Sequence, residues 1–158
     1  MDVEKVKEYL KSYADLKRKV KRQREIIIEA WNETQIPAIK PSDGSQRLPG
    51  GKGRLESSSI RHMDRQAKAE QTISECEDQM QRIRDAVECI KDPNEKDALF
   101  YRYMTGNGSR LTKWRLVAVD VLGDDDEKDV QAVKRYAKQG LQSLGRILEE
   151  HEEYHVDL

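Results

Sequence analysis

Five residues near the C-terminus match a pattern known from zinc proteases. His151, Glu152 and His155 fit H-E-x-x-H, in which two His on one helical face bind zinc and the Glu acts as general base. That chemistry also needs a third ligand and a walled cleft. Only three residues follow the match, and an acidic stretch produces such matches by accident. We therefore expect no catalytic site, no metal site and no cofactor.

Two other groups of residues lack the context that their chemistry needs. The segment Gly50–Gly53 superficially resembles a phosphate loop, but it has neither the Walker spacing nor a Ser or Thr after Lys52. Cys76 and Cys89 are thirteen residues apart on one predicted helix. This separation is about 20 Å, too far for a disulfide. We expect two free thiols in a cytoplasmic protein, with Cys76 a small core residue.

The last predicted helix carries the strongest candidate binding surface. Its predicted core face consists of Val130, Val133, Ala137, Leu141, Leu144 and Leu148. The opposite face carries Lys128, Gln131, Lys134, Arg135 and Lys138. Cations at such positions can contact phosphates, and Gln131 or Arg135 can read base edges. Lys113 and Arg115, at the start of the preceding helix, are further candidate phosphate contacts. The alternative interpretation is an ordinary solvated helix face.

The composition predicts long helices that pack in pairs or coils. Of the 158 residues, 36% are hydrophobic and 37% charged, and the mean hydropathy is −0.92, which leaves little for one large core. Residues 1–68 hold 16 Lys and Arg against 10 Asp and Glu, whereas residues 69–158 hold 13 against 20. The basic half is therefore the N-terminal one. There is no apolar run of 18 residues and no signal peptide, so we expect no membrane contact.

Apolar spacing divides the first part of the chain into two helices and a linker. Residues 1–33 form a basic amphipathic helix with a heptad seam, and residues 34–59, rich in Pro, Gly and Ser, form a flexible linker. Residues 60–91 form a long amphipathic helix that pairs with the first as a hairpin or coiled-coil arm. Its apolar stripe is the predicted association surface of a homodimer, and it consists of Ile73, Cys76, Met80, Ile83, Val87 and Ile90.

Residues 92–158 are predicted to form a compact trihelical domain with an acidic tail at 149–153 that frays. Asp92 and Pro93 have the residue types of a helix N-cap and first position. The buried face of this first helix is predicted to consist of Leu99, Phe100, Tyr103 and Met104. Trp114 begins a second helix, whose core it joins, and Gly123 ends it.

The order of Asp92-Pro93, Leu99, Arg102-Tyr103, Gly106, Trp114, Val117-Ala118, Leu122 and Ala137-Lys138 resembles the region-four helix-turn-helix of sigma factors. More narrowly, the chain is similar to small phage-encoded regulators of Gram-positive bacteria, the ArpU- and RinA-like late-gene activators. That family also has a basic N-terminal helix, a Pro/Gly/Ser loop and a long helix before the domain. The acidic turn Gly123–Glu127 departs from the family pattern, because it places four carboxylates where DNA phosphates would approach.

The resemblance implies an all-α fold, a long helical arm followed by a C-terminal helix-turn-helix domain. It implies a DNA-binding transcription regulator of phage or prophage type, acting in the cytoplasm of a bacterial host. The expected partners are double-stranded DNA, a second copy of the chain and host RNA polymerase. Two alternatives remain open: a small terminase subunit-like packaging protein, and a protein-interaction module that acts on RNA polymerase.

Overall fold

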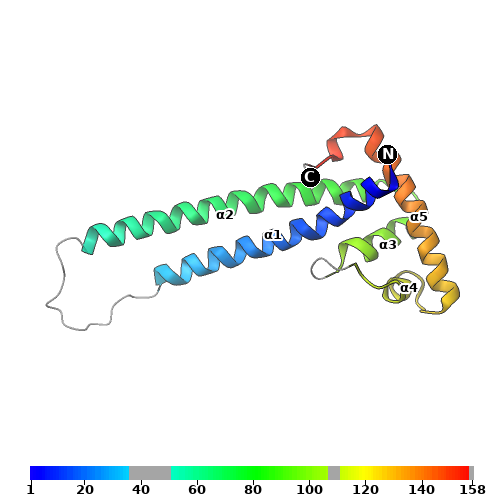
Figure 1. The fold of residues 1–158 in the computed structure, drawn as a ribbon, viewed down its shortest axis with the longest axis horizontal. Helices are drawn as coiled ribbons and strands as arrows, with labels where there is room; N and C mark the ends of the chain where they lie inside the picture. Colours follow the sequence, from blue (N-terminus) through cyan, green and yellow to red (C-terminus); the bar gives the residue numbers. More distant parts are fainter. Residues whose placement is uncertain (36–50, 107–110, 157–158) are drawn as a thin grey trace. The chain divides into compact units, whose positions relative to one another are not determined.

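The computed structural model describes residues 1–35, 51–106 and 111–156, with side chains except for 34–35 and 51–59. All regular secondary structure in these residues is helical, as predicted (Figure 1). The elements are α1 (Val3–Gln35), α2 (Gly51–Glu88), α3 (Pro93–Leu99), the π-helical turn η1 (Phe100–Met104), α4 (Trp114–Leu122), α5 (Glu127–Glu150) and the 3-10 turn η2 (Glu152–Tyr154). None of the described helices is long and apolar enough to span a membrane.

The start of α2 lies earlier than the sequence indicates. We predicted a linker over 34–59, but residues 34–35 belong to α1 and residues 51–59 to α2, while 36–50 lie outside the described residues. After Pro49 the next proline is Pro93, so no pyrrolidine ring interrupts the helical hydrogen bonds from Gly51 onward. The far end of α2 also differs, since it stops at Glu88, three residues short of the expected end.

The chain divides into two compact units, Lys19–Glu75 and a larger one formed by Met1–Arg18 with Cys76–Leu158. Within the smaller unit, Glu29 of α1 lies 3.8 Å from Arg65 of α2, and Glu33 lies 3.2 Å from His62 Nδ1. Glu33 follows Glu29 along α1, whereas its partner His62 precedes Arg65 along α2. The two helices therefore run antiparallel at these contacts. The buried apolar side chains of this unit are Val20, Ala30 and Ala69.

The larger unit is built around α5, which packs against α3 and α4 (Figure 1). Its largest fully buried side chains come from all five helices and are Val6, Leu10, Ile83, Val87, Leu99, Val117, Val133, Leu144 and Leu148. The predicted start of α3 is confirmed, because the Asp92 carboxylate accepts a hydrogen bond of 2.9 Å from the Asn94 N–H and Pro93 takes the first helical position.

The apolar stripe predicted for α2 is covered by other residues of the same chain. The predicted association residues Cys76, Met80, Ile83, Val87 and Ile90 are 0–8% exposed, and Ile73 is half-buried. Side chains already covered in this way offer little surface to a second copy. A homodimer therefore needs residues other than this stripe.

The acidic end of the chain is docked through residue 156, although its charge suggested a frayed tail. The Tyr9 hydroxyl of α1 donates a hydrogen bond of 2.7 Å to the Tyr154 carbonyl, and burial raises the pKa of this hydroxyl, so it remains a donor. The amino group of Met1 pairs with Glu149. Because His151 ends α5 and η2 follows, the H-E-x-x-H residues do not share one α-helical face.

Two glycines let α5 approach its neighbours closely. A Cβ at Gly140 would lie 3.0 Å from the Glu95 backbone oxygen and 3.0 Å from the Leu99 side chain, both in α3. At Gly145 the nearest atom would be a methyl carbon of Val6, at 3.4 Å. The first distance is shorter than a normal contact, and a backbone oxygen inside a helix cannot rotate away. The α3–α5 contact therefore depends on Gly140.

Gly140→Ala should lower the free energy of unfolding by about 1–2 kcal/mol, because overpacking outweighs the gain in helix propensity. The matched variant Gly145→Ala, where there is room for the methyl group, should be neutral or stabilise by up to about 1 kcal/mol. Chemical denaturation of both variants measures the difference. Equal effects at the two positions would show that α3 and α5 are not in this close contact.

Candidate nucleic-acid interface

A short glycine-containing turn joins α4 to α5. Gly123 has a φ of +83°, in the left-handed region that favours glycine, and its N–H donates a hydrogen bond of 2.9 Å to the Val119 carbonyl. Such a residue is a common helix terminator. Only Asp124–Asp126 separate it from the start of α5 at Glu127. Two helices joined by so short a turn match the connection in helix-turn-helix motifs.

Arg102 fixes the segment that leads into α4. Its guanidinium carbon lies 4.2 Å from the centroid of the Trp114 ring, and its Nη1 donates a hydrogen bond to the Thr112 carbonyl. The Thr112 N–H in turn donates to the Arg102 carbonyl at 3.1 Å. Burial lowers the pKa of Arg102, but an arginine stays charged at neutral pH. Tyr103 is buried as predicted, whereas Phe100, also predicted to be buried, is 39% exposed. Trp114 is only half-buried, and its ring supports the Arg102 cation.

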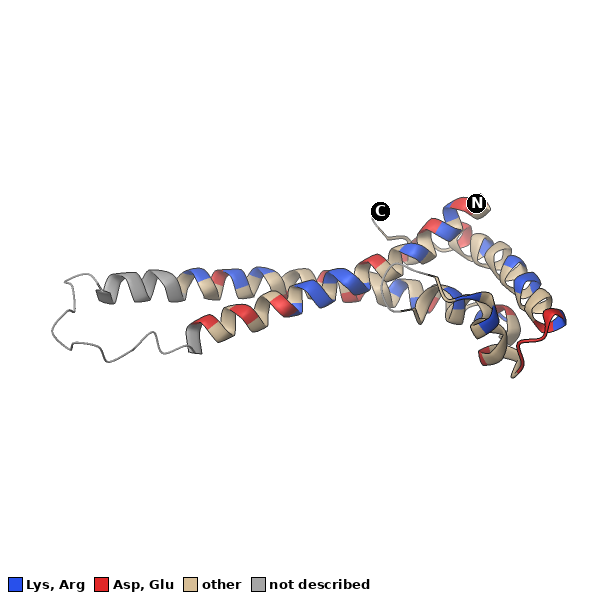
Figure 2. Ribbon diagram, turned by 60° about the horizontal axis from the view of Figure 1, so that its bottom comes forward, with Lys and Arg blue, Asp and Glu red and all other residues tan. Residues whose placement is uncertain are grey.

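The five predicted contact residues of α5 are all exposed and share one side of the helix. They are Lys128, Gln131, Lys134, Arg135 and Lys138. Their spacing of three and four residues follows the helical repeat, and Figure 2 shows the basic positions along α5. The predicted core residues Val133, Ala137, Leu141, Leu144 and Leu148 are all buried. Val130, also predicted in the core, is only half-buried. We call the five exposed residues the α5 strip.

Lys113 and Arg115 are exposed but lie apart from the turn. Lys113 is the N-cap of α4 and Arg115 lies in its first turn. Since α4 has nine residues, its start is about 13 Å along its axis from the end that leads into α5. The structure therefore gathers the α5 strip into one surface and leaves these two cations at the other end of α4.

The strip continues beyond the residues that sequence reasoning selected. Gln142 and Arg146 are exposed on α5, four and eight residues after Lys138. The signal was present in the sequence, because the same spacing continues from Lys138. The exposed polar side of α5 therefore extends from Lys128 to Arg146.

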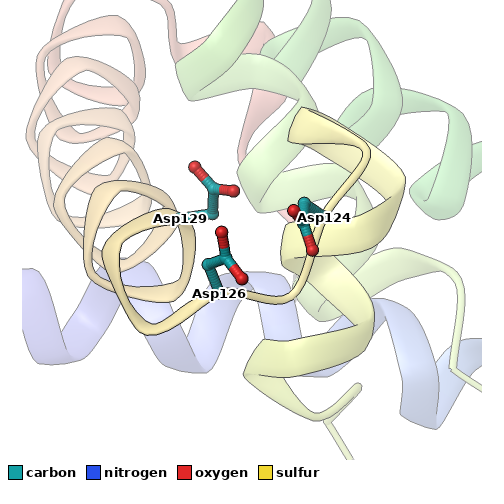
Figure 3. Close-up of side chains that lie close together, drawn as sticks. All are labelled: Asp124, Asp126 and Asp129. Carbon is teal, nitrogen blue, oxygen red and sulfur yellow. The ribbon is translucent and has the colours of Figure 1, made fainter.

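The N-terminal end of α5 is strongly acidic. Carboxylate oxygens of Asp124, Asp126 and Asp129 all lie within 4.8 Å of one another (Figure 3). Asp124 is the main reason that the pKa of Asp126 is raised, because its negative charge disfavours a second one nearby. Asp126 caps α5 without a side-chain hydrogen bond. These carboxylates are stabilised by the positive end of the helix dipole. Their negative charges repel phosphates that approach the same end.

Comparisons with protein-family models, with curated proteins and with solved structures gave no match for this chain.

Proposed function

We propose that this chain is a DNA-binding transcription regulator of phage or prophage type, a late-gene activator. In this proposal α4, the Gly123 turn and α5 form a helix-turn-helix, with α5 as the helix that enters the major groove. The antiparallel parts of α1 and α2 form a long hairpin arm. Double-stranded DNA is the principal partner, and host RNA polymerase is a second.

The observation that carries the proposal is the α5 strip. It opposes a fully buried apolar side, so the core holds the strip outward without strain. It follows a glycine turn of the length that helix-turn-helix units use. Its chemistry suits both parts of DNA recognition, since Lys134 and Lys138 supply charge for phosphates and Gln131 and Arg135 supply donors for base edges.

The acidic turn restricts which part of α5 can meet DNA. Lys134 is seven residues after Glu127, about 10 Å along the helix axis. This distance is close to the Debye length of about 8 Å at physiological ionic strength. Salt therefore screens most of the repulsion from Asp124–Glu127 at the position of Lys134, whereas Lys128 lies among the carboxylates. We infer that contacts centre on residues 131–138.

A second candidate function is favoured by the same acidic end. Carboxylates gathered at the start of α5 suit a basic protein surface better than they suit DNA. The chain would then be an interaction module that acts on RNA polymerase through this end. The two functions predict different effects of neutralising Asp124–Asp126. A DNA-binding regulator would bind DNA more tightly, whereas an interaction module would lose binding to its protein partner.

Replacing Lys134, Arg135 and Lys138 together with Ala should weaken binding to duplex DNA and flatten its salt dependence. Fewer counterions are released when fewer phosphates are neutralised, so the slope of log K against log salt should fall in magnitude by roughly 2–3. Fluorescence anisotropy of a labelled duplex at several salt concentrations measures this slope.

The matched control replaces three exposed lysines of α1, Lys17, Lys19 and Lys21, with Ala. It removes the same charge from the most basic segment of the chain, and it should leave the slope almost unchanged. If the control flattened the slope and the α5 variant did not, the contact surface would be α1 and the proposed α5 contact would be wrong.

Replacing Asp124, Asp125 and Asp126 with Asn should strengthen non-specific DNA binding severalfold, with the largest gain at low salt, because three repulsive charges are removed. Asn also caps helices well, so the start of α5 should be kept. A control with Glu150, Glu152 and Glu153 changed to Gln removes equal charge at the other end of α5. If the two variants bound alike, the acidic turn would lie away from DNA.

A further inference from the structure

The outer side of α4 exposes apolar side chains. Leu116 is 57% exposed and Val119 is 44% exposed, while Val117 and Ala118 between them are fully buried against the rest of the larger unit. Residues three apart on a helix are neighbours on its surface, so Leu116 and Val119 form one patch.

One charge of each sign flanks this patch. Arg115 immediately precedes Leu116, and Asp120 immediately follows Val119; both are exposed. On a helix of 3.6 residues per turn, these two side chains lie about 140° apart, on opposite edges of the patch. They cannot reach each other within the helix, and neither has an ion pair or side-chain hydrogen bond within residues 1–35, 51–106 and 111–156.

The spacing of Arg115, Leu116, Val119 and Asp120 is that of residues at the interface of two parallel helices. With Leu116 and Val119 at the two core positions of a heptad, Arg115 and Asp120 take the two flanking positions. Leu116 and Val119 then take heptad positions a and d, Arg115 takes position g and Asp120 takes position e. In a parallel pair with a twofold axis along the helices, a residue at g faces the residue at e, five positions further on, in the partner. Arg115 then faces Asp120 of the other copy, and the relation holds in both directions.

We propose that the outer side of α4 is a homodimer surface, where a second copy packs in parallel through Leu116 and Val119 and forms reciprocal Arg115–Asp120 ion pairs. The occupant is a second copy because the patch is self-complementary in charge. In an antiparallel pair, like charges would share each edge. The surface is independent of the α2 stripe, which is covered within the chain, and it assigns Arg115 to the dimer and not to DNA phosphates.

The dimer is weak. A helix of nine residues offers much less than the roughly 800 Å² per partner that stable complexes bury. We therefore expect the chain to be monomeric at low micromolar concentration and to associate at higher concentration.

Sedimentation equilibrium of the full chain between about 1 and 500 μM tests this proposal, because association in this range is weak but measurable. Leu116→Lys should abolish the concentration-dependent rise in mass. The matched control is Met63→Lys, which changes a residue 68% exposed in the smaller unit and should leave the rise unchanged. Circular dichroism checks that both variants keep their helices.

Charge exchange tests the ion pairs. Arg115→Asp and Asp120→Arg should each be monomeric alone, because each places like charges at both edges of the pair. An equimolar mixture of the two variants should associate at least as strongly as the wild type, because every edge then joins opposite charges. A wild type that stays monomeric at the highest concentration, an associating Leu116→Lys variant, or a mixture that stays monomeric would each overturn the proposal.

Discussion

Burial of the apolar side of α5 is the interaction on which the larger unit depends. Val133, Leu144 and Leu148 are fully or almost fully buried, and each such side chain contributes roughly 1.5–3 kcal/mol. The close approach at Gly140 fixes how α5 lies on α3. Residues point in all directions around a helix, so burying one face of α5 in the core determines which residues face solvent. The α5 strip is thus a consequence of packing.

The electrostatics of α5 combine two requirements that conflict. Carboxylates at its first turn stabilise the helix through its dipole. Their negative charges also repel one another, which raises the pKa of Asp126. In the proposed function, the same charges oppose DNA at the first turn of α5. The proposed contact at residues 131–138 meets both requirements, because salt screens the carboxylates over that distance.

Local patterns in the sequence predicted the helices and their buried sides well. The spacing of Val133, Ala137 and Leu141 identified the core side of α5, and Asp92-Pro93 identified the start of α3, because both signals depend on neighbouring residues. The start of α2 was missed because Gly and Ser weaken a helix without forbidding one.

Contacts between distant residues could not be predicted from local patterns. Nothing near Gly140 in the sequence indicates that Glu95 lies against it. The contact between Arg102 and Trp114 likewise joins residues that meet only in the folded chain. The exposed patch at Leu116 and Val119 was missed for a related reason. The apolar pattern of this helix left both residues unassigned, and only the packed structure distinguishes the covered side of α4 from its open side.

The central claim is that DNA contacts the middle of α5. The most direct test is a titration of isotope-labelled full-length protein with duplex DNA, following backbone amide chemical shifts at physiological salt. The largest changes should fall at residues 131–138, with smaller ones at Asp124–Glu127. Changes confined to the basic segment 17–24 of α1, or no changes at any DNA concentration, would contradict the claim.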